Sequence, residues 1–213
     1  MNGPSGSGKG TLAHAIADEL GFHFLDSGAL YRIIGCVAQS RQVAFEETPA
    51  AQLAQSLDIQ FTQGQVLVDD EDLTDTIRTE DAGALASQVA ALPAVRDAVL
   101  ALQRSFKRPP GLVADGRDMG TVVFTEAPLK IFLEASAQER AQRRYKQLKN
   151  KGLSVSLPGL LAQIEERDAR DRGRAIAPLV AADDAWVIDS TQMTIEAVVD
   201  AVMAKAAELG FSG

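Results

Sequence analysis

The spacing of hydrophobic residues alternates between helical and strand-like along the chain. Apolar positions recur at helical spacing over residues 12–20, and Gly21 provides the stop. A short apolar run follows at 22–25 and closes on polar turn residues, which predicts a buried strand. Helical spacing returns at 29–40, and a further helix is predicted at 48–57. This alternation is the first indication of an α/β fold.

A different pattern interrupts it after residue 57. Ile59 and Phe61, and then Val66 and Val68, alternate with polar residues on either side of Gln63-Gly64. Alternation around a short polar turn predicts an antiparallel hairpin. We interpret the hairpin as a small insert in the α/β fold.

The second half of the chain returns to alternating helices and strands. Two helices are predicted at 79–91 and 94–106, with Pro93 placed to open the second. The segments "GLVADGRD" and "LKIFLEA" are short apolar runs bounded by polar turns, as expected of central parallel strands. The last predicted elements are helices at 137–149 and 157–170, a strand at 185–189 and a helix at 195–209. The chain therefore predicts an α/β fold with a parallel sheet flanked by helices.

Length and composition place the chain among ordinary globular proteins. Its 213 residues are enough for one domain with a substantial core, and Cys36 is the single cysteine. It shows no charged segment followed by an apolar leader, and no apolar run near 18 residues in length. We therefore expect a cytoplasmic protein that does not span a membrane.

Charge is distributed unevenly. The net charge of −8 argues against general nucleic-acid binding, which needs a basic surface. Ten of the 21 basic residues nevertheless fall between 139 and 174. They are Arg140, Arg143, Arg144, Lys146, Lys149, Lys151, Arg167, Arg170, Arg172 and Arg174. Concentrated positive charge on an acidic protein suits a small polyanion.

The glycine-rich stretch "GPSGSGKGT" at residues 3–11 points to phosphate binding. Gly3, four residues, and then Gly8-Lys9 match most of the P-loop pattern, in which backbone N–H groups wrap phosphates and the lysine reaches the outer pair. The general pattern has Ser or Thr directly after the lysine, whereas here Gly10 intervenes before Thr11. A direct role for Thr11 as a metal ligand is therefore open.

Two other interpretations of this stretch fit less well. Residues 8–13 formally match the dinucleotide pattern G-x-G-x-x-A, but Asp26 comes too early to serve as the acidic residue that ends the second strand. A flexible glycine linker would not explain the lysine or the immediate start of a helix. Phosphate binding is the favoured interpretation.

Candidate acceptor residues follow two of the predicted strands. "LDSGALYR" places Ser27 and Arg32 beyond the strand at 22–25, and "ADGRDMGTVVF" places Arg117 and Asp118 beyond another. Ligands of α/β folds bind at such strand ends. The segments "ERDARDRGR" and "ERAQRRYKQLKNKG" leave two interpretations open: ion pairs along a solvated helix face, or a lid that closes over phosphates.

Over nearly its whole length the sequence resembles the bacterial cytidylate (CMP) kinases, a family of nucleoside-monophosphate kinases. The resemblance rests on "GPSGSGKGT", "LDSGALYR", "IRTE", "SQVAALPAVR", "DGRDMGTVVF" and "ERDARDRGRAIAPL". The first segment is shared by many monophosphate kinases, and the others together are more specific. The resemblance implies one kinase domain over 1–213, with a monophosphate-binding insert at about 50–105 and a lid at about 137–172.

The resemblance also implies site residues. Those expected at ATP are Gly3, Pro4, Ser5, Gly6, Ser7, Gly8, Lys9, Gly10, Thr11 and Arg143. Those expected at CMP are Ser27, Arg32, Ser87, Arg96, Arg117, Asp118, Arg167, Asp171 and Arg174. Lys9, Arg117 and Arg174 are expected to be catalytic; Ser87, Arg96 and Asp118 are expected to read the cytosine edge.

The implied reaction is phosphorylation of CMP and dCMP by ATP, in pyrimidine nucleotide metabolism, by a monomer. A phosphate acceptor has a second pKa of about 6 and needs no strong base. Catalysis would come from positioning and from charge neutralisation by Lys9, arginines and the Mg²⁺ carried by ATP.

A rival hypothesis comes from the two residues before Gly3. P-loop folds place a strand before the loop, and Met1 and Asn2 are too few to form one. We therefore expect the first strand to be missing or truncated. The alternative function is that of an N-terminally truncated, catalytically weak nucleotide-binding protein with the same fold.

Overall fold

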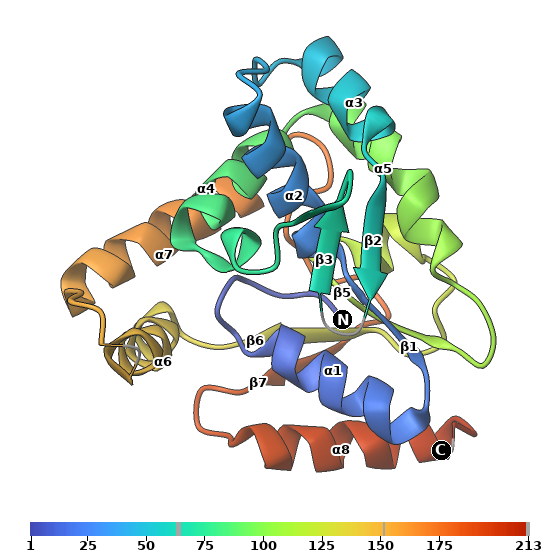
Figure 1. Ribbon diagram of the computed structural model, residues 1–213. Coiled ribbons are helices and arrows are strands. Elements are labelled where there is room, and N and C mark those ends of the chain that lie inside the picture. The colour runs from blue at the N-terminus through green and yellow to red at the C-terminus, as the bar shows by residue number, and fades with distance from the viewer. Residues whose placement is uncertain (63–64, 151, 212–213) are drawn as a thin grey trace. The chain divides into compact units, whose positions relative to one another are not determined.

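The computed structural model describes residues 1–62, 65–150 and 152–211, and it divides into two compact units. The first unit joins Met1–Leu25 to Phe106–Gly213, and the second is Asp26–Ser105. Figure 1 labels the helices and strands of both. The predicted insert at 50–105 and lid at 137–172 stay predictions.

The first unit contains two pairs of strands. β1 (His23–Asp26) pairs with β5 (Leu112–Asp115), and β6 (Ile131–Glu134) pairs in parallel with β7 (Trp186–Asp189). Asn2 joins the two pairs, because it forms parallel bridges with Gly116, just after β5, and with Phe132 of β6. The first strand predicted to be missing is thus represented by this one pairing position between β5 and β6.

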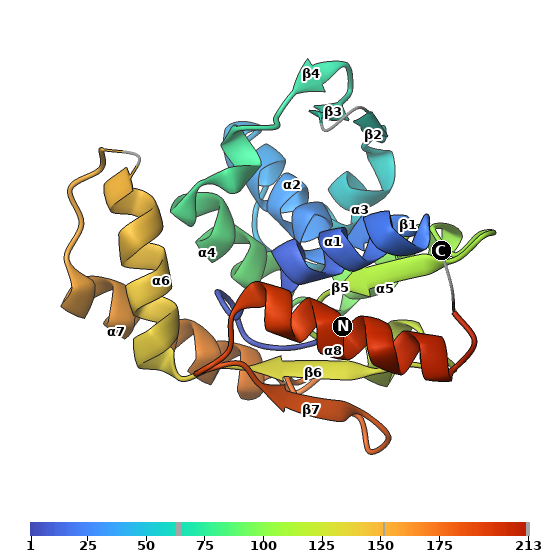
Figure 2. The same cartoon turned by 90° about the horizontal axis from the view of Figure 1, so that it is seen from below.

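Four helices and a π-helical turn complete the first unit. They are α1 (Lys9–Leu20), η2 (Met119–Val123), α6 (Ala137–Asn150), α7 (Leu157–Arg172) and α8 (Ile195–Glu208). Figures 1 and 2 show α1 and α8 lying side by side along β6 and β7. Their apolar faces form one buried cluster with Ile131, Leu133 and Ile188 of these strands.

Local sequence explains where these helices begin. Ser156 and Thr194 cap α7 and α8, since their hydroxyls accept hydrogen bonds from Gly159 N–H and Ala197 N–H. α1 begins differently. It follows Gly8, whose φ of 94° is left-handed, and among the described residues no side chain caps it. The start of an α-helix that lacks a side-chain cap is a place where backbone N–H groups can bind an anion.

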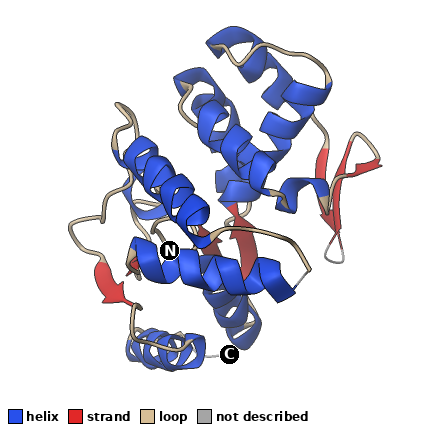
Figure 3. Ribbon diagram, turned by 90° about the vertical axis from the view of Figure 1, so that its left-hand side faces the viewer, coloured by secondary structure: helices blue, strands red, loops and turns tan. Residues whose placement is uncertain are grey.

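The second unit is mostly helical. Its helices are α2 (Ser27–Ser40), α3 (Glu47–Ser56), α4 (Glu80–Val89) and α5 (Pro93–Ser105), with a 3₁₀ turn η1 (Thr76–Arg78). The strands β2 (Ile59–Thr62), β3 (Gln65–Val68) and β4 (Glu71–Asp72) form an antiparallel sheet, and Figure 3 draws strands in red. Val66 and Val68 of β3 pack with α2 and α3 residues in the core of this unit.

The predicted α/β fold with a parallel sheet and an antiparallel insert is confirmed. The predicted helices and strands are present with bounds that differ by a few residues, and α5 does begin at Pro93. The predicted hairpin turn at Gln63-Gly64 lies outside the described residues. β4, η1 and η2, which are two, three and five residues long, were not predicted. Among the described helices no single one is long and apolar enough to cross a membrane. α4 and α5 reach that length and hydropathy only when they are taken together, and the chain bends by 105° between them.

Candidate active site

The loop at residues 3–8 has a backbone that depends on its glycines. Gly3, Gly6 and Gly8 have φ values of 149°, 78° and 94°, a region that residues with a Cβ rarely adopt. At Gly3 a Cβ would also lie 2.2 Å from the carbonyl oxygen of Leu133. The loop can therefore approach β6 closely and turn into α1 only with glycine at these positions.

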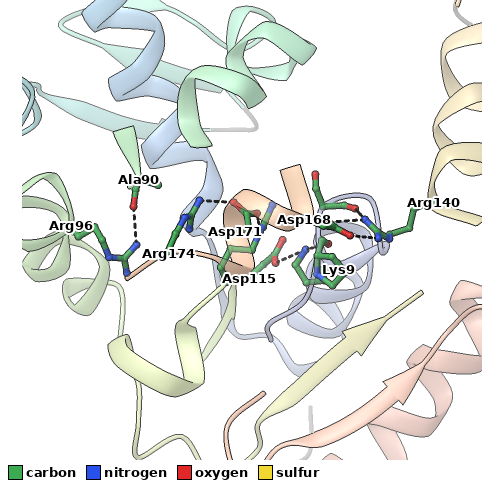
Figure 4. A network of polar contacts seen from close by, with 11 residues as sticks. Lys9, Ala90, Arg96, Asp115, Arg140, Asp168, Asp171 and Arg174 are labelled. Carbon is green, nitrogen blue, oxygen red and sulfur yellow. Dashed lines mark hydrogen bonds and ion pairs between the residues drawn. The ribbon is translucent and has the colours of Figure 1, made fainter. Parts of the chain in front are cut away.

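Lys9, the first residue of α1, is buried with 5% of its surface exposed. Its Nζ donates a hydrogen bond to the carbonyl oxygen of Pro4 at 2.9 Å, across the loop, and lies 3.9 Å from Oδ1 of Asp115. Figure 4 shows Lys9 and Asp115 facing each other. The structure thus holds an ammonium group and a carboxylate at the base of the loop.

Asp115 was not among the predicted site residues. It is the last residue of β5 and is 7% exposed. A Cβ at Gly10 would lie 3.4 Å from its Oδ2, so the carboxylate sits against the glycine that departs from the general P-loop pattern. The apolar run before it, which placed Asp115 at a strand end in the sequence, was the available signal.

Two buried oxygens, one from the glycine loop and one from the end of β5, are of the kind that binds a hard cation. Among the described residues, Asp115 Oδ1 and Ser7 Oγ have no hydrogen-bond partner. Carboxylate and hydroxyl oxygens are ligands that Mg²⁺ accepts in P-loop proteins, where the metal is shared with nucleotide phosphates. The residues present therefore fit a Mg²⁺ ion that arrives with a nucleotide.

A second cluster is built on α7. Asp171, 1% exposed, accepts a hydrogen bond from Arg117 Nε at 3.1 Å and another from Arg174 Nη2 at 2.6 Å. Figure 4 shows Arg174 turned toward Asp171. Burial acts to raise the pKa of Asp171, but the charges of Arg117, Arg174 and Arg167 outweigh it and hold this pKa below its usual value. The carboxylate gathers three predicted site arginines.

This lowered pKa predicts a pH dependence of stability. A carboxyl group whose pKa is lower in the folded state stabilises the protein above its unfolded pKa, and the contribution is lost as the pH falls through the folded pKa. We expect the difference in Tm between the wild type and Asp171→Asn to shrink between about pH 5 and about pH 2. Thermal unfolding at several pH values would measure it; a constant difference would contradict the assignment.

Asn2 connects the start of the chain to this region. Its side chain is 4% exposed, and its Oδ1 accepts a hydrogen bond at 2.8 Å from the backbone N–H of Met119. Asp118, which precedes Met119, is 2% exposed. Asn2 therefore fixes the backbone directly after the predicted base-reading carboxylate.

Arg140 of α6 is a further residue that sequence reasoning missed. It is 3% exposed, and its guanidinium donates to the carbonyl oxygens of Ala135 and Ser5 at 2.9 Å each. It also forms a two-pronged ion pair with Asp168 of α7, drawn in Figure 4. Arg140 thus links the end of β6, the glycine loop and α7, one turn before Asp171.

We expect Arg140→Lys to lower kcat/KM for ATP by about tenfold. A lysine keeps the charge but cannot bond both carbonyls and the carboxylate at once, so the loop would lose its link to α7. Arg170→Lys is the matched control, because Arg170 forms an exposed i,i+4 pair with Glu166 on α7. Steady-state kinetics with varied ATP would measure both; equal effects in the two variants would show that the link does not position the loop.

Some of the basic residues between 139 and 174 form ion pairs along helix faces, which is one of the two interpretations of their sequence. Arg143 donates to Glu139, four residues earlier on α6, at 3.1 Å and to the carbonyl oxygen of Ser190 at 2.7 Å. Its role at ATP stays a prediction. The interpretation of "ERDARDRGR" as a face with ion pairs holds for Arg170 and Glu166, while Asp171 is buried and its arginines are half-buried.

The predicted acceptor residues Ser27, Arg32, Ser87 and Arg96 belong to the second unit. Ser27 accepts a hydrogen bond from Gln103, and Arg32 donates to the carbonyl oxygens of Ile77 and Thr79 at 2.8 and 3.0 Å.

Ser87 and Arg96 are also buried. The Arg96 guanidinium contacts the carbonyl oxygen of Ala90 at 3.5 Å, as Figure 4 shows, and lies 6.0 Å from the centre of the Tyr31 ring. Their polar groups are thus oriented within this unit by α2, α4 and α5.

A glycine loop opening a helix, a buried lysine and a strand-end carboxylate together define a P-loop nucleotide-binding protein. The cytidylate kinase family model matches residues 1–208. The chain belongs to the cytidylate kinase family.

Curated relatives called cytidylate kinase agree closely with the chain. One from Aeromonas salmonicida (strain A449) is 54% identical over 211 residues, covering 97% of this chain and 92% of its own. One from Pseudomonas aeruginosa (strain UCBPP-PA14) is 57% identical over 210 residues, covering 95% and 92%. One from Azotobacter vinelandii (strain DJ / ATCC BAA-1303) is 53% identical over 220 residues, covering 100% and 96%.

Proposed function

We propose that the protein transfers the γ-phosphoryl group of ATP to CMP, giving ADP and CDP. The observation that carries this proposal is the coupling of the glycine loop to the arginine cluster: Arg140 bonds Ser5 of the loop and Asp168 of α7, one turn from Asp171 with Arg117 and Arg174. A phosphate cradle is thereby tied to a second group of phosphate-binding residues. Family membership supports CMP as the acceptor.

The residues of the loop would bind the donor. The N–H groups at the start of α1, which no described side chain caps, would hold ATP phosphates, and Lys9 would leave the Pro4 carbonyl to neutralise charge on the outer two. Arg117 and Arg174 would hold the acceptor phosphate and the transferring group, because a guanidinium bonds two phosphate oxygens and stays charged. No base is needed, since the acceptor oxygen is already ionised.

Mg²⁺ is part of the proposal. Asp115, with Ser7 of the loop, would hold the ion against the ATP phosphates; Thr11 is exposed and fits this role less well. When bound, Mg²⁺ neutralises charge on the phosphates.

The same proposal includes finer expectations. dCMP would be a second acceptor, and the protein would be a cytoplasmic monomer that binds neither nucleic acid nor membranes. Arg167 would contact the acceptor, Arg143 would face the donor, and α6 with α7 would act as a lid that excludes water.

Cytosine selectivity is expected to depend on Asp118, Ser87 and Arg96. Asp118→Ala should reduce the preference for CMP over UMP by about ten- to a hundredfold, because a buried charged hydrogen-bonding group would be lost from the base site. Arg96→Ala should act in the same direction. Asp97→Ala, which removes an exposed carboxylate beside Arg96, is the matched control. If the ratio of kcat/KM for CMP to that for UMP is unchanged in Asp118→Ala, Asp118 does not recognise the cytosine base.

The reaction itself has a direct test. The protein is incubated with Mg·ATP and CMP, and nucleotides are separated by chromatography over time. We expect equal amounts of CDP and ADP. ADP without CDP would contradict phosphoryl transfer to CMP and would indicate hydrolysis alone.

A further inference from the structure

One buried polar side chain of the second unit has no part in the mechanism proposed above. Gln103, in the last turn of α5, is 1% exposed, although glutamine is a residue type that lies mostly at protein surfaces. Its Nε2 donates a hydrogen bond at 2.9 Å to Oγ of Ser27, 76 residues earlier in the chain. Burying an amide costs free energy that an apolar side chain of the same size does not cost. The amide therefore points to a role beyond packing.

The direction of this hydrogen bond limits what the Ser27 hydroxyl can do. A serine hydroxyl carries one proton and two lone pairs, whereas an amide nitrogen can only donate. Gln103 therefore occupies a lone pair of Ser27 Oγ and leaves the proton of the hydroxyl for another acceptor. Among the residues that the structure describes, none accepts that proton.

Gln103 lies on the same face of α5 as Arg96, which is expected to read the cytosine edge. The two residues are seven positions apart, about two helical turns, and both belong to the buried face of α5 with Val95 and Val99. Ser27 begins α2 and is 2% exposed. One helix face thus carries a predicted base-reading residue and the amide that orients a second predicted CMP-binding residue.

We propose that Gln103 is a positioning residue for the acceptor nucleotide: it holds the Ser27 hydroxyl as a hydrogen-bond donor to an oxygen of the bound nucleoside monophosphate. The inference rests on the proposed function, because it assigns Ser27 to the place where CMP binds. Unprotonated oxygens, above all those of a phosphate group, accept such a bond. A hydroxyl that is already oriented loses less rotational freedom on binding, so Gln103 tightens CMP binding without touching CMP.

A double-mutant cycle tests whether Gln103 acts through Ser27. Gln103→Met removes the amide at nearly constant side-chain length, Ser27→Ala removes the hydroxyl, and a third variant carries both substitutions. The readouts are the Kd for CMP, measured by calorimetry, and kcat and KM for CMP at saturating Mg·ATP. Gln55→Met, at an exposed position of α3, is the matched control.

We expect Gln103→Met to raise Kd and KM for CMP about three- to fivefold and Ser27→Ala about tenfold, with kcat nearly unchanged. The double variant should bind CMP as Ser27→Ala does, because Gln103 then has no hydroxyl to orient. An unchanged Kd in Gln103→Met, or effects that multiply in the double variant, would overturn the proposal. Either result, with a wild-type protein that makes CDP, refutes this inference alone, whereas a wild type that makes no CDP refutes the proposed function.

Gln103→Glu tests the direction of the hydrogen bond and serves in the same cycle if Gln103→Met does not fold. A carboxylate has nearly the shape of the amide but only accepts, so it would draw the Ser27 proton away from the nucleotide. We expect Gln103→Glu to raise the Kd for CMP at least as much as Ser27→Ala, and by less than about twofold in the Ser27→Ala background. An unchanged Kd would overturn the proposal. An equally large increase in the Ser27→Ala background would overturn it as well, because the carboxylate would then act through its charge.

Discussion

Replacing Lys9 by alanine is expected to lower kcat for phosphorylation of CMP by roughly 10²–10³-fold. Lys9 is the buried ammonium at the base of the glycine loop, held by Pro4 and facing Asp115. Without it, charge that develops on the transferring group would lose its fixed positive partner. Because this loss concerns the donor, turnover should fall with any acceptor. Steady-state assays at saturating ATP and CMP measure it.

Lys205→Ala is the control for this variant, because Lys205 forms only an exposed pair with Glu208 on α8 among the described residues. Circular dichroism would establish that Lys9→Ala is folded. A folded Lys9→Ala variant with near-normal turnover would contradict the proposed mechanism.

The second large effect is expected on stability. Asp171→Asn should lower the free energy of unfolding by about 3–5 kcal/mol, because it leaves the charges of Arg174 and of the half-buried Arg117 without their buried carboxylate. For a chain of this size the loss corresponds to a fall in Tm of roughly 6–20 °C.

Asp200→Asn on α8 is the matched control, since Asp200 is exposed. Thermal unfolding near neutral pH compares the two variants with the wild type. If Asp171→Asn unfolds at the same temperature as Asp200→Asn, the arginine cluster does not depend on its carboxylate.

Hydrophobic periodicity predicted nearly all of the fold, because each long element has an apolar face to bury. α5 was predicted to begin at Pro93, and it does. β4 was missed since its two residues, Glu71 and Asp72, carry charges and no apolar pattern. The pairing of Asn2 with both β5 and β6 could not be predicted either, because it depends on contacts with residues more than 100 positions away.

The candidate site was predictable where its residues lie close together in the sequence. The glycine loop and Lys9 follow from one short stretch of sequence, and the i,i+3 spacing of Asp171 and Arg174 is visible in "DRGR". Asp115 and Arg140 were missed because their roles come from tertiary contacts: one faces Lys9 from β5, and the other joins Ser5 to Asp168. Apart from the apolar run that places Asp115 at a strand end, their sequence neighbourhoods do not distinguish them from ordinary strand-end or helix-surface residues.

The most direct test of the central claim is a comparison of acceptors. The kcat/KM for phosphorylation by Mg·ATP is measured with CMP, dCMP, UMP and AMP under identical conditions. We expect CMP to be the preferred acceptor, with dCMP used and UMP and AMP used poorly. Equal kcat/KM values for CMP, UMP and AMP would contradict the assignment of CMP as the substrate.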